Sequence, residues 1–195
     1  MFVLTVDQRR SRERDDLVEA TMAALNRDAR RPLRLAFDRT AGDEMQAVTD
    51  NPATASAIAL ELAASGQWSV GIGVGMVREP LPDNTRAGAG EAFGRARAAV
   101  TAAKAAPGHI AVSGASVLAG QAEAVLQLVA SVAHKRSRLS VEAGLLIDQG
   151  LTQQEAAERL GISQQAVSAR LHSGLWHESR RAAEVAAALL EGADA

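Results

Sequence analysis

The sequence predicts an α+β domain followed by an all-helical domain. Short apolar runs alternate with helical patterns through the first 114 residues, whereas the rest of the chain shows helical patterns alone. Alanine supplies much of the hydrophobic content of 47%, and aromatic residues make up only 3%, a balance that favours closely packed helices. We therefore expect an α/β domain over 1–114, a long linking helix over 115–138 and a helical domain over 139–195.

The N-terminal part has the element order strand, helix, strand, strand, helix, strand, helix, strand. Strands are expected at 1–6, 33–37, 45–49, 68–77 and 109–114, and helices at 15–26, 54–65 and 91–105. In 68–77 apolar residues alternate with glycine, which indicates a strand that another backbone approaches closely. Two crossings around a central hairpin imply an antiparallel sheet with helices on one face, a ferredoxin-like or palm-type layer.

Composition limits the chemistry and the location of the protein. No cysteine is present, which excludes disulfides and thiolate metal sites. The first apolar run turns charged at residue 7, and no stretch of eighteen apolar residues occurs, so we expect a cytoplasmic protein. The net charge is −2, but residues 134–181 hold seven Lys/Arg against five Asp/Glu, which permits a nucleic-acid surface there.

The segment LTQQEAAERLGISQQAVSARL, residues 151–171, matches a helix-turn-helix pattern. Thr152 and Glu155 form a capping box that begins the first helix. Gly161 stands where the chain must turn between the helices in a left-handed conformation, and Ser163 caps the second helix. Val167 and Leu171, four residues apart, are expected to face inward.

The second helix of this motif carries short polar side chains near its N-terminus, as major-groove readers do. The residues expected to contact double-stranded DNA are Thr152, Ser163, Gln164, Gln165, Ser168, Arg170 and His172. The alternative is a plain helical hairpin used for packing. Because one such unit contacts few base pairs, we expect a homodimer. The long helix and a last helix near 178–191 are candidate dimer elements, although packing within one chain would explain them equally well.

An acidic hairpin is the second notable feature. Asp7 closes the first strand, and Asp43 and Glu44 follow Gly42 at the centre of the expected sheet. Converging carboxylates make a site for a hard cation such as Mg²⁺, able to hold a nucleotide phosphate. The simpler interpretation is a turn whose carboxylates are solvated. Likewise, the basic run at 9–16 is either a phosphate-binding loop or a solvated helix start.

Four segments extend this pattern: VLTVD, AGDEMQAV, WSVGIGVGMV and GEAFGRARAA. Together they resemble the palm-type core of class III nucleotidyl cyclases and GGDEF-type diguanylate cyclases. The resemblance implies Asp7 and Asp43 as metal ligands, and Glu44 in the place of the glutamate of the GGDEF signature. However, Gly94 and Ala98 stand where class III cyclases use asparagine and arginine, which implies lost transition-state stabilisation.

The chain also resembles the SatD family of bacterial regulatory proteins over nearly its whole length. The matching residues are Asp7 with Ser11-Arg12, Gly42-Asp43-Glu44-Met45-Gln46, Gly71-Ile72-Gly73, and Gly90-Glu91-Ala92 with Ala96-Arg97. The ligand-binding residues expected on this basis are Asp7, Arg12, Asp43, Glu44 and Arg97.

The leading hypothesis is a dimeric, DNA-binding transcriptional regulator. Its cyclase-like domain would be catalytically degenerate and would bind a small ligand such as a nucleotide. One alternative is an active nucleotidyl cyclase, or a related phosphoryl-transfer enzyme, with a DNA-binding tail. Another has the N-terminal layer acting only as a dimerisation scaffold.

Overall fold

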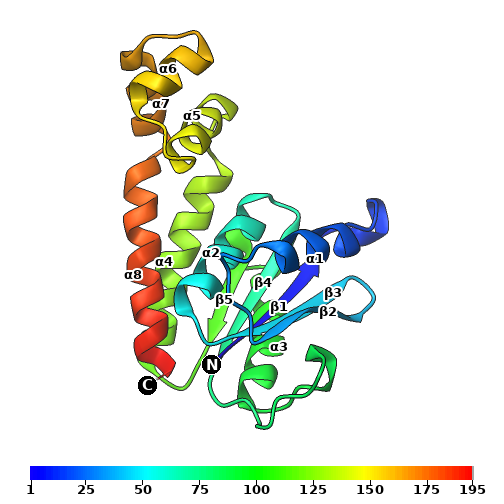
Figure 1. Ribbon diagram of the computed structural model, residues 1–195. Helices are drawn as coiled ribbons and strands as arrows, with labels where there is room; N and C mark the ends of the chain where they lie inside the picture. The colour runs from blue at the N-terminus through cyan, green and yellow to red at the C-terminus, as the bar shows by residue number, and fades with distance from the viewer. Residues whose placement is uncertain (195) are drawn as a thin grey trace.

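The structure is a computed structural model that describes residues 1–194 (Figure 1). The strands are β1 (Phe2–Gln8), β2 (Leu35–Ala41), β3 (Glu44–Thr49), β4 (Trp68–Val74) and β5 (Ile110–Ser113). The helices are α1 (Val18–Arg27), α2 (Pro52–Ala64), α3 (Glu91–Ala103), α4 (Val117–His134), α5 (Arg138–Asp148), α6 (Gln153–Leu160), α7 (Gln164–Ser173) and α8 (Trp176–Asp194). Short 3₁₀ turns are η1 (Ser11–Glu13), η2 (Thr85–Ala87) and η3 (Pro107–His109).

The five strands form one mixed sheet in the order β2-β3-β1-β4-β5. The predicted α+β class and element order are confirmed. β1 pairs antiparallel with both β3 and β4, and β2 pairs antiparallel with β3. The prediction of a wholly antiparallel sheet is wrong at β5, which pairs parallel with β4. The reason is that α3 carries the chain back along the sheet between these two strands, as a parallel crossover requires.

Helices cover both faces of the sheet, so the prediction of helices on one face is wrong. Apolar side chains from α1, α2, α4 and α8 share one core with Phe2, Leu4 and Val6 of β1. α3 lies on the opposite face, against β4, β5 and β1. It lies so close that a Cβ on Gly71 would come within 2.2 Å of Val100 N. The glycine alternation in β4 therefore admits the backbone of α3.

Side chains close both edges of the sheet. At β2, Asn26 of α1 accepts a hydrogen bond from Phe37 N at 2.8 Å and donates one to Phe37 O at 2.9 Å. At β5, Glu123 accepts from Val112 N at 2.7 Å, and Gln127 donates to the Ile110 carbonyl at 3.0 Å. These contacts occupy backbone groups that would otherwise pair with another strand.

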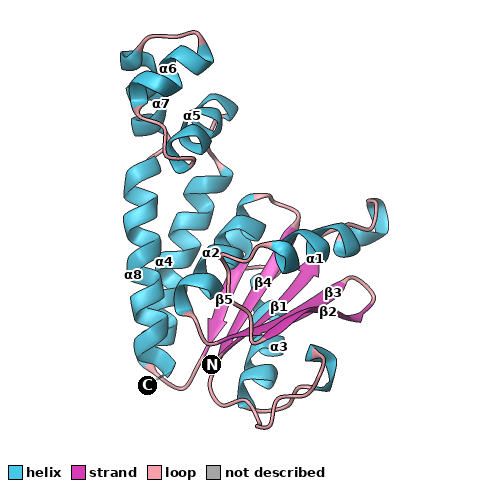
Figure 2. Ribbon diagram, viewed as in Figure 1, coloured by secondary structure: helices cyan, strands magenta, loops and turns pink. Residues whose placement is uncertain are grey.

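The C-terminal helices form an elongated unit on one side of the sheet (Figure 2). α4 and α8 pack along one another, and α5, α6 and α7 lie at the end of this pair that is farther from the chain termini. Within residues 1–194, α4 is the one helix that could cross a membrane by length and composition, yet it packs on α8 and β5. Four helices, α5 to α8, follow α4. Ser137 caps α5 by accepting from Ser140 N, which separates α5 from α4.

Candidate nucleic-acid interface and ligand pocket

The first helix of the helix-turn-helix begins at the predicted capping box, and the chain turns at the predicted glycine. Thr152 Oγ1 accepts from Glu155 N at 3.2 Å, and the Glu155 carboxylate accepts from Thr152 N at 2.7 Å. The hydrogen bond from the Thr152 backbone is the main cause that lowers the pKa of Glu155. Gly161 adopts a left-handed conformation with φ of 65°, and Ser163 Oγ accepts from Ala166 N at 3.2 Å. The local geometry of the motif is thus fixed by its own side chains.

α5 completes a three-helix unit around the motif. Its core is buried, as predicted for Val167 and Leu171. The buried members are Ala143, Ala156, Ala157, Val167, Leu171 and Trp176. A Cβ on Gly144 of α5 would lie 2.2 Å from the indole of Trp176, so α5 packs flat against that ring. This packing holds α7 with its other side turned to solvent.

The outward side of α7 is polar. Gln164, Gln165, Ser168 and His172 are all exposed. At about 100° per residue, the last three of these project within roughly 60° of one another, forming one face. Arg170 does not belong to it: its side chain is half-buried and projects roughly 160° from His172. The structure therefore gathers Gln165, Ser168 and His172 on one face, leaves Gln164 exposed beside it, and sets Arg170 apart.

Thr152 and Ser163, the other two predicted contacts, are exposed residues whose hydroxyls cap α6 and α7. They stand at helix N-termini, where free backbone N–H groups and the helix dipole favour an anion such as a DNA phosphate. Their position suits contacts to the DNA backbone rather than to base edges.

In the N-terminal domain, two acidic residues lie side by side under α3. Asp7 and Glu44 are partners in the β1–β3 register. Each carboxylate has a cation from α3 or its C-cap: Lys104 Nζ, at the C-cap, lies 2.8 Å from Asp7 Oδ2, and Arg97 Nη2 lies 2.9 Å from Glu44 Oε1. Thr40 Oγ1 also donates to Glu44 Oε1 at 2.7 Å. Glu44 is buried in β3 rather than at the tip of the hairpin, so the simple solvated turn is wrong for this residue.

A pocket of about 390 Å³ opens beside these pairs. It is lined by Asp7, Asp43, Ser69 and Lys104, together with residues 8–13, which include Arg12. Glu44 and Arg97 are not among its lining residues, so three of the five predicted ligand residues share it. Sequence reasoning missed Lys104, which is seven residues, about two helical turns, after Arg97 and therefore on the same face of α3.

The loop that forms one wall of this pocket, residues 9–16, is held in place at both ends. Gln8 donates to the Asp15 carbonyl at 2.7 Å and accepts from Leu17 N at 2.9 Å. At the other end, Arg9 N donates to Gln67 O and its guanidinium donates to Gly66 O, both at 2.8 Å. The basic run is therefore an ordered loop and not the start of a helix.

Two features of this pocket favour an anion, namely its arginines and the buried hydroxyl of Ser69. Burial, followed by the charges of Arg10 and Arg14, lowers the pKa of Arg9. Ser69, opposite Asp7 in the β1–β4 register, lines the pocket. Its Oγ is buried without a hydrogen-bond partner within the described residues. An anion bound here would lower the repulsion among the arginines and could accept from Ser69.

The C-terminal part of the chain matches a known protein family. Residues 121–177 match the family model of Sigma-70, region 4. This span covers α4 from its second turn, all of α5, α6 and α7, and the start of α8. No curated protein and no solved structure was found to match. The family match confirms a DNA-binding helix-turn-helix of a type that works in transcription, in the compartment that holds the DNA. The N-terminal resemblances stay predictions.

Proposed function

We propose that this protein is a transcriptional regulator that reads double-stranded DNA with the exposed face of α7. The single observation that supports it best is this polar face on a helix-turn-helix that matches Sigma-70 region 4. Gln165 and Ser168 offer hydrogen bonds to base edges, since glutamine can pair with adenine through two bonds. The N-terminal ends of α6 and α7 would bind phosphates and set the register.

Mobility-shift assays across fragments from the protein's own promoter region test this function. We expect sequence-preferring complexes that weaken as salt is raised. Gln165→Ala should weaken specific binding roughly tenfold or more, because a two-bond contact contributes about 1–3 kcal/mol of discrimination. Gln121→Ala, an exposed glutamine on α4, is the matched control and should bind as the parent does. Binding that ignores sequence, or equal losses in both variants, would refute α7 as the reading helix.

The proposed regulator acts as a homodimer. α4 and α8 bury one side against each other and the sheet, yet Val117, Leu128 and Val185 on these helices are 75%, 64% and 54% exposed. Apolar side chains of this size favour a second copy as a partner. Sedimentation equilibrium should show a dimer that Leu128→Glu dissociates. A parent protein that stays monomeric at the concentration where it binds DNA would contradict this part.

The N-terminal pocket is proposed to bind a nucleotide through its phosphates. Support comes from the cations Arg9, Arg10 and Arg12 around an ordered loop and from the unpartnered hydroxyl of Ser69. Mg²⁺ fits less well, because Asp7 is already paired with Lys104. Moreover, no group of three or more potential ligand side chains gathers in the described part of the chain. A hard cation needs several oxygen ligands, so an anion held directly by arginine is the better occupant.

Calorimetry with a panel of nucleoside mono-, di- and triphosphates tests the pocket. Affinity should rise with phosphate number and fall at least tenfold in Arg12→Ala. Arg78→Ala, an exposed arginine outside the pocket, should leave the affinity unchanged. If every nucleotide binds the two variants equally, the assignment is wrong. An active cyclase remains the weaker alternative, since Gly94 and Ala98 supply no donor; cyclic product from ATP or GTP with manganese would support it instead.

A further inference from the structure

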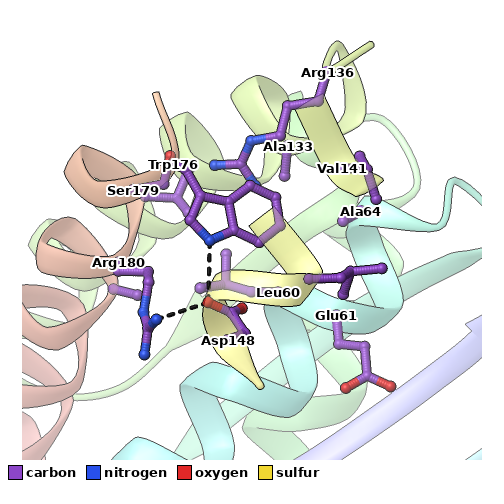
Figure 3. Close-up of a pocket in the computed structure, with 13 residues that line it drawn as sticks. Leu60, Glu61, Ala64, Ala133, Arg136, Val141, Asp148, Trp176, Ser179 and Arg180 are labelled. Carbon is purple, nitrogen blue, oxygen red and sulfur yellow. Dashed lines mark hydrogen bonds and ion pairs between the residues drawn. The ribbon is translucent and has the colours of Figure 1, made fainter. Parts of the chain in front are cut away.

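A second pocket lies where α5 of the three-helix unit meets the α/β domain (Figure 3). Its volume is about 450 Å³, within the roughly 300–1,000 Å³ of small-molecule sites. Residues of α2, α4, α5 and α8 line it. α2 packs against α4 and α8, whereas α5 packs against α6 and α7, and the pocket fills the space between α2 and α5. A molecule in this pocket would therefore touch both halves of the protein.

The walls of the pocket are mainly apolar. They include Leu60, Ala64, Val129, Val141, Leu145 and Trp176. Leu145 is 51% exposed although it belongs to a concave wall, so an occupant would remove apolar surface from water that the fold leaves uncovered. These features favour a ligand with a large apolar part.

The polar groups at the pocket are arranged around Trp176. Its indole Nε1 donates to Asp148 Oδ1 at 3.0 Å, and Arg180 donates to the same oxygen at 2.7 Å, as the dashed lines in Figure 3 mark. Within residues 1–194 no group donates to the other oxygen, Oδ2, which is free to accept a hydrogen bond. The guanidinium of Arg136 stacks 4.5 Å from the indole centroid and donates to Gly174 O at 2.7 Å.

The charges of the lining cancel. Arg136 and Arg180 are balanced by Asp148 and by Glu61, which is itself paired with Arg31. The lining therefore has no net formal charge to attract an ion, and its apolar walls disfavour a buried charge, so an uncharged molecule fits best. We propose that this pocket binds a small, uncharged, largely apolar molecule with one N–H or O–H donor for Asp148, and that its occupancy changes the DNA affinity of the helix-turn-helix.

The coupling has a physical basis in the position of the pocket. α5 joins α4 only through the short segment 135–137, and α5 holds the packing of α7. A ligand that contacts α2 on one side and α5 on the other binds one relative orientation of the two halves better than others. By linkage, it must then shift the population toward that orientation and alter DNA binding.

The test uses the full chain and N-phenyl-1-naphthylamine, an uncharged aromatic probe with a single N–H donor. We expect saturable binding, followed by probe fluorescence on excitation of Trp176 in a Trp68→Phe background. Leu145→Ala should weaken binding about tenfold through lost apolar contact. Leu139→Ala is the matched control, since this leucine lies on the same helix, is 50% exposed and is not part of the pocket. Equal affinities in these two variants would overturn the site.

A second variant, which fills the pocket with a larger side chain, tests the site even if Leu145→Ala disturbs α5. Ala64→Phe should abolish probe binding, whereas Ala57→Phe, exposed on the same helix outside the pocket, should not. Retained binding in Ala64→Phe would overturn the assignment. For the coupling, saturating probe should shift the affinity for a mixed-sequence duplex at low salt at least threefold, and this shift should vanish in Ala64→Phe. Probe binding with unchanged DNA affinity would overturn the coupling. Because the duplex has a mixed sequence, this affinity does not depend on whether α7 reads specific bases.

Discussion

Replacing Gly71 by alanine is expected to push α3 away from the sheet. The new Cβ would lie 2.2 Å from Val100 N and 2.6 Å from Ala96 O, whereas ordinary contacts begin at 3.4 Å. Both obstacles are backbone atoms, so no change of side-chain rotamer relieves the clash and the helix must shift by about 1 Å. Overpacking of this kind costs about 1–3 kcal/mol, and we expect the upper end.

Differential scanning calorimetry measures the effect. A loss of about 3 kcal/mol should lower the melting temperature of the unit that contains the sheet by roughly 6–12 °C for a chain of this size. The shift should also weaken nucleotide binding, because Lys104, the C-cap residue of α3, lines the ligand pocket.

Gly94→Ala provides the control on the same helix. Nothing lies within 4 Å of a Cβ there, and alanine favours helix over glycine by up to about 1 kcal/mol. This variant should therefore melt at or slightly above the parent temperature. If Gly71→Ala melted together with Gly94→Ala, the close approach of α3 to β4 would be refuted.

Three further outcomes follow from local contacts. Thr152→Ala removes the hydroxyl that caps α6 and should cost about 1 kcal/mol by thermal melting, whereas Thr152→Ser should cost little; an unchanged melt in the alanine variant would contradict the capping role. The lowered pKa of Glu155 means that its charge stabilises the fold above its unfolded pKa near 4.5 and ceases to do so as pH falls through the folded value. Glu155→Gln should consequently melt below the parent at pH 7 and at the same temperature as the parent in acid. A difference in melting temperature that persists in acid would contradict this pH dependence. Asn26→Ala frees the backbone of Phe37 at the β2 edge and should raise self-association in light scattering, an effect that Asn84→Ala, which loses only the cap of η2, should not share.

The accuracy of the sequence predictions varies with the range of the contacts involved. The hairpin turn at Gly42, the end of α2 before Gly66 and the strands around them were predictable because each depends on residues close in the chain. Which helices cover each face of the sheet was not predictable. The glycines of β4 indicated a close neighbour, but periodicity alone cannot tell which helix lies there, and the parallel pairing of β5 depends on the path of α3.

The same division holds for the two functional regions. The helix-turn-helix was predictable because its capping box, left-handed glycine and inward residues all act within a segment of about twenty residues. The acidic site was predicted as a metal centre, yet the ion pair between Asp7 and Lys104 joins residues 97 positions apart. No local pattern encodes such a pair.

By itself, therefore, the sequence determined the local elements and the DNA-binding motif, since hydrogen bonds and apolar spacing within single helices suffice for them. Only the tertiary structure decided which cations pair with Asp7 and Glu44 and which elements α8 packs against. α8 returns along α4 to contribute Ala186 and Leu190 to the core of the sheet. Trp176, at the start of α8, lines the pocket of about 450 Å³ together with residues of α2, α4 and α5, where helices far apart in the chain meet through packing alone.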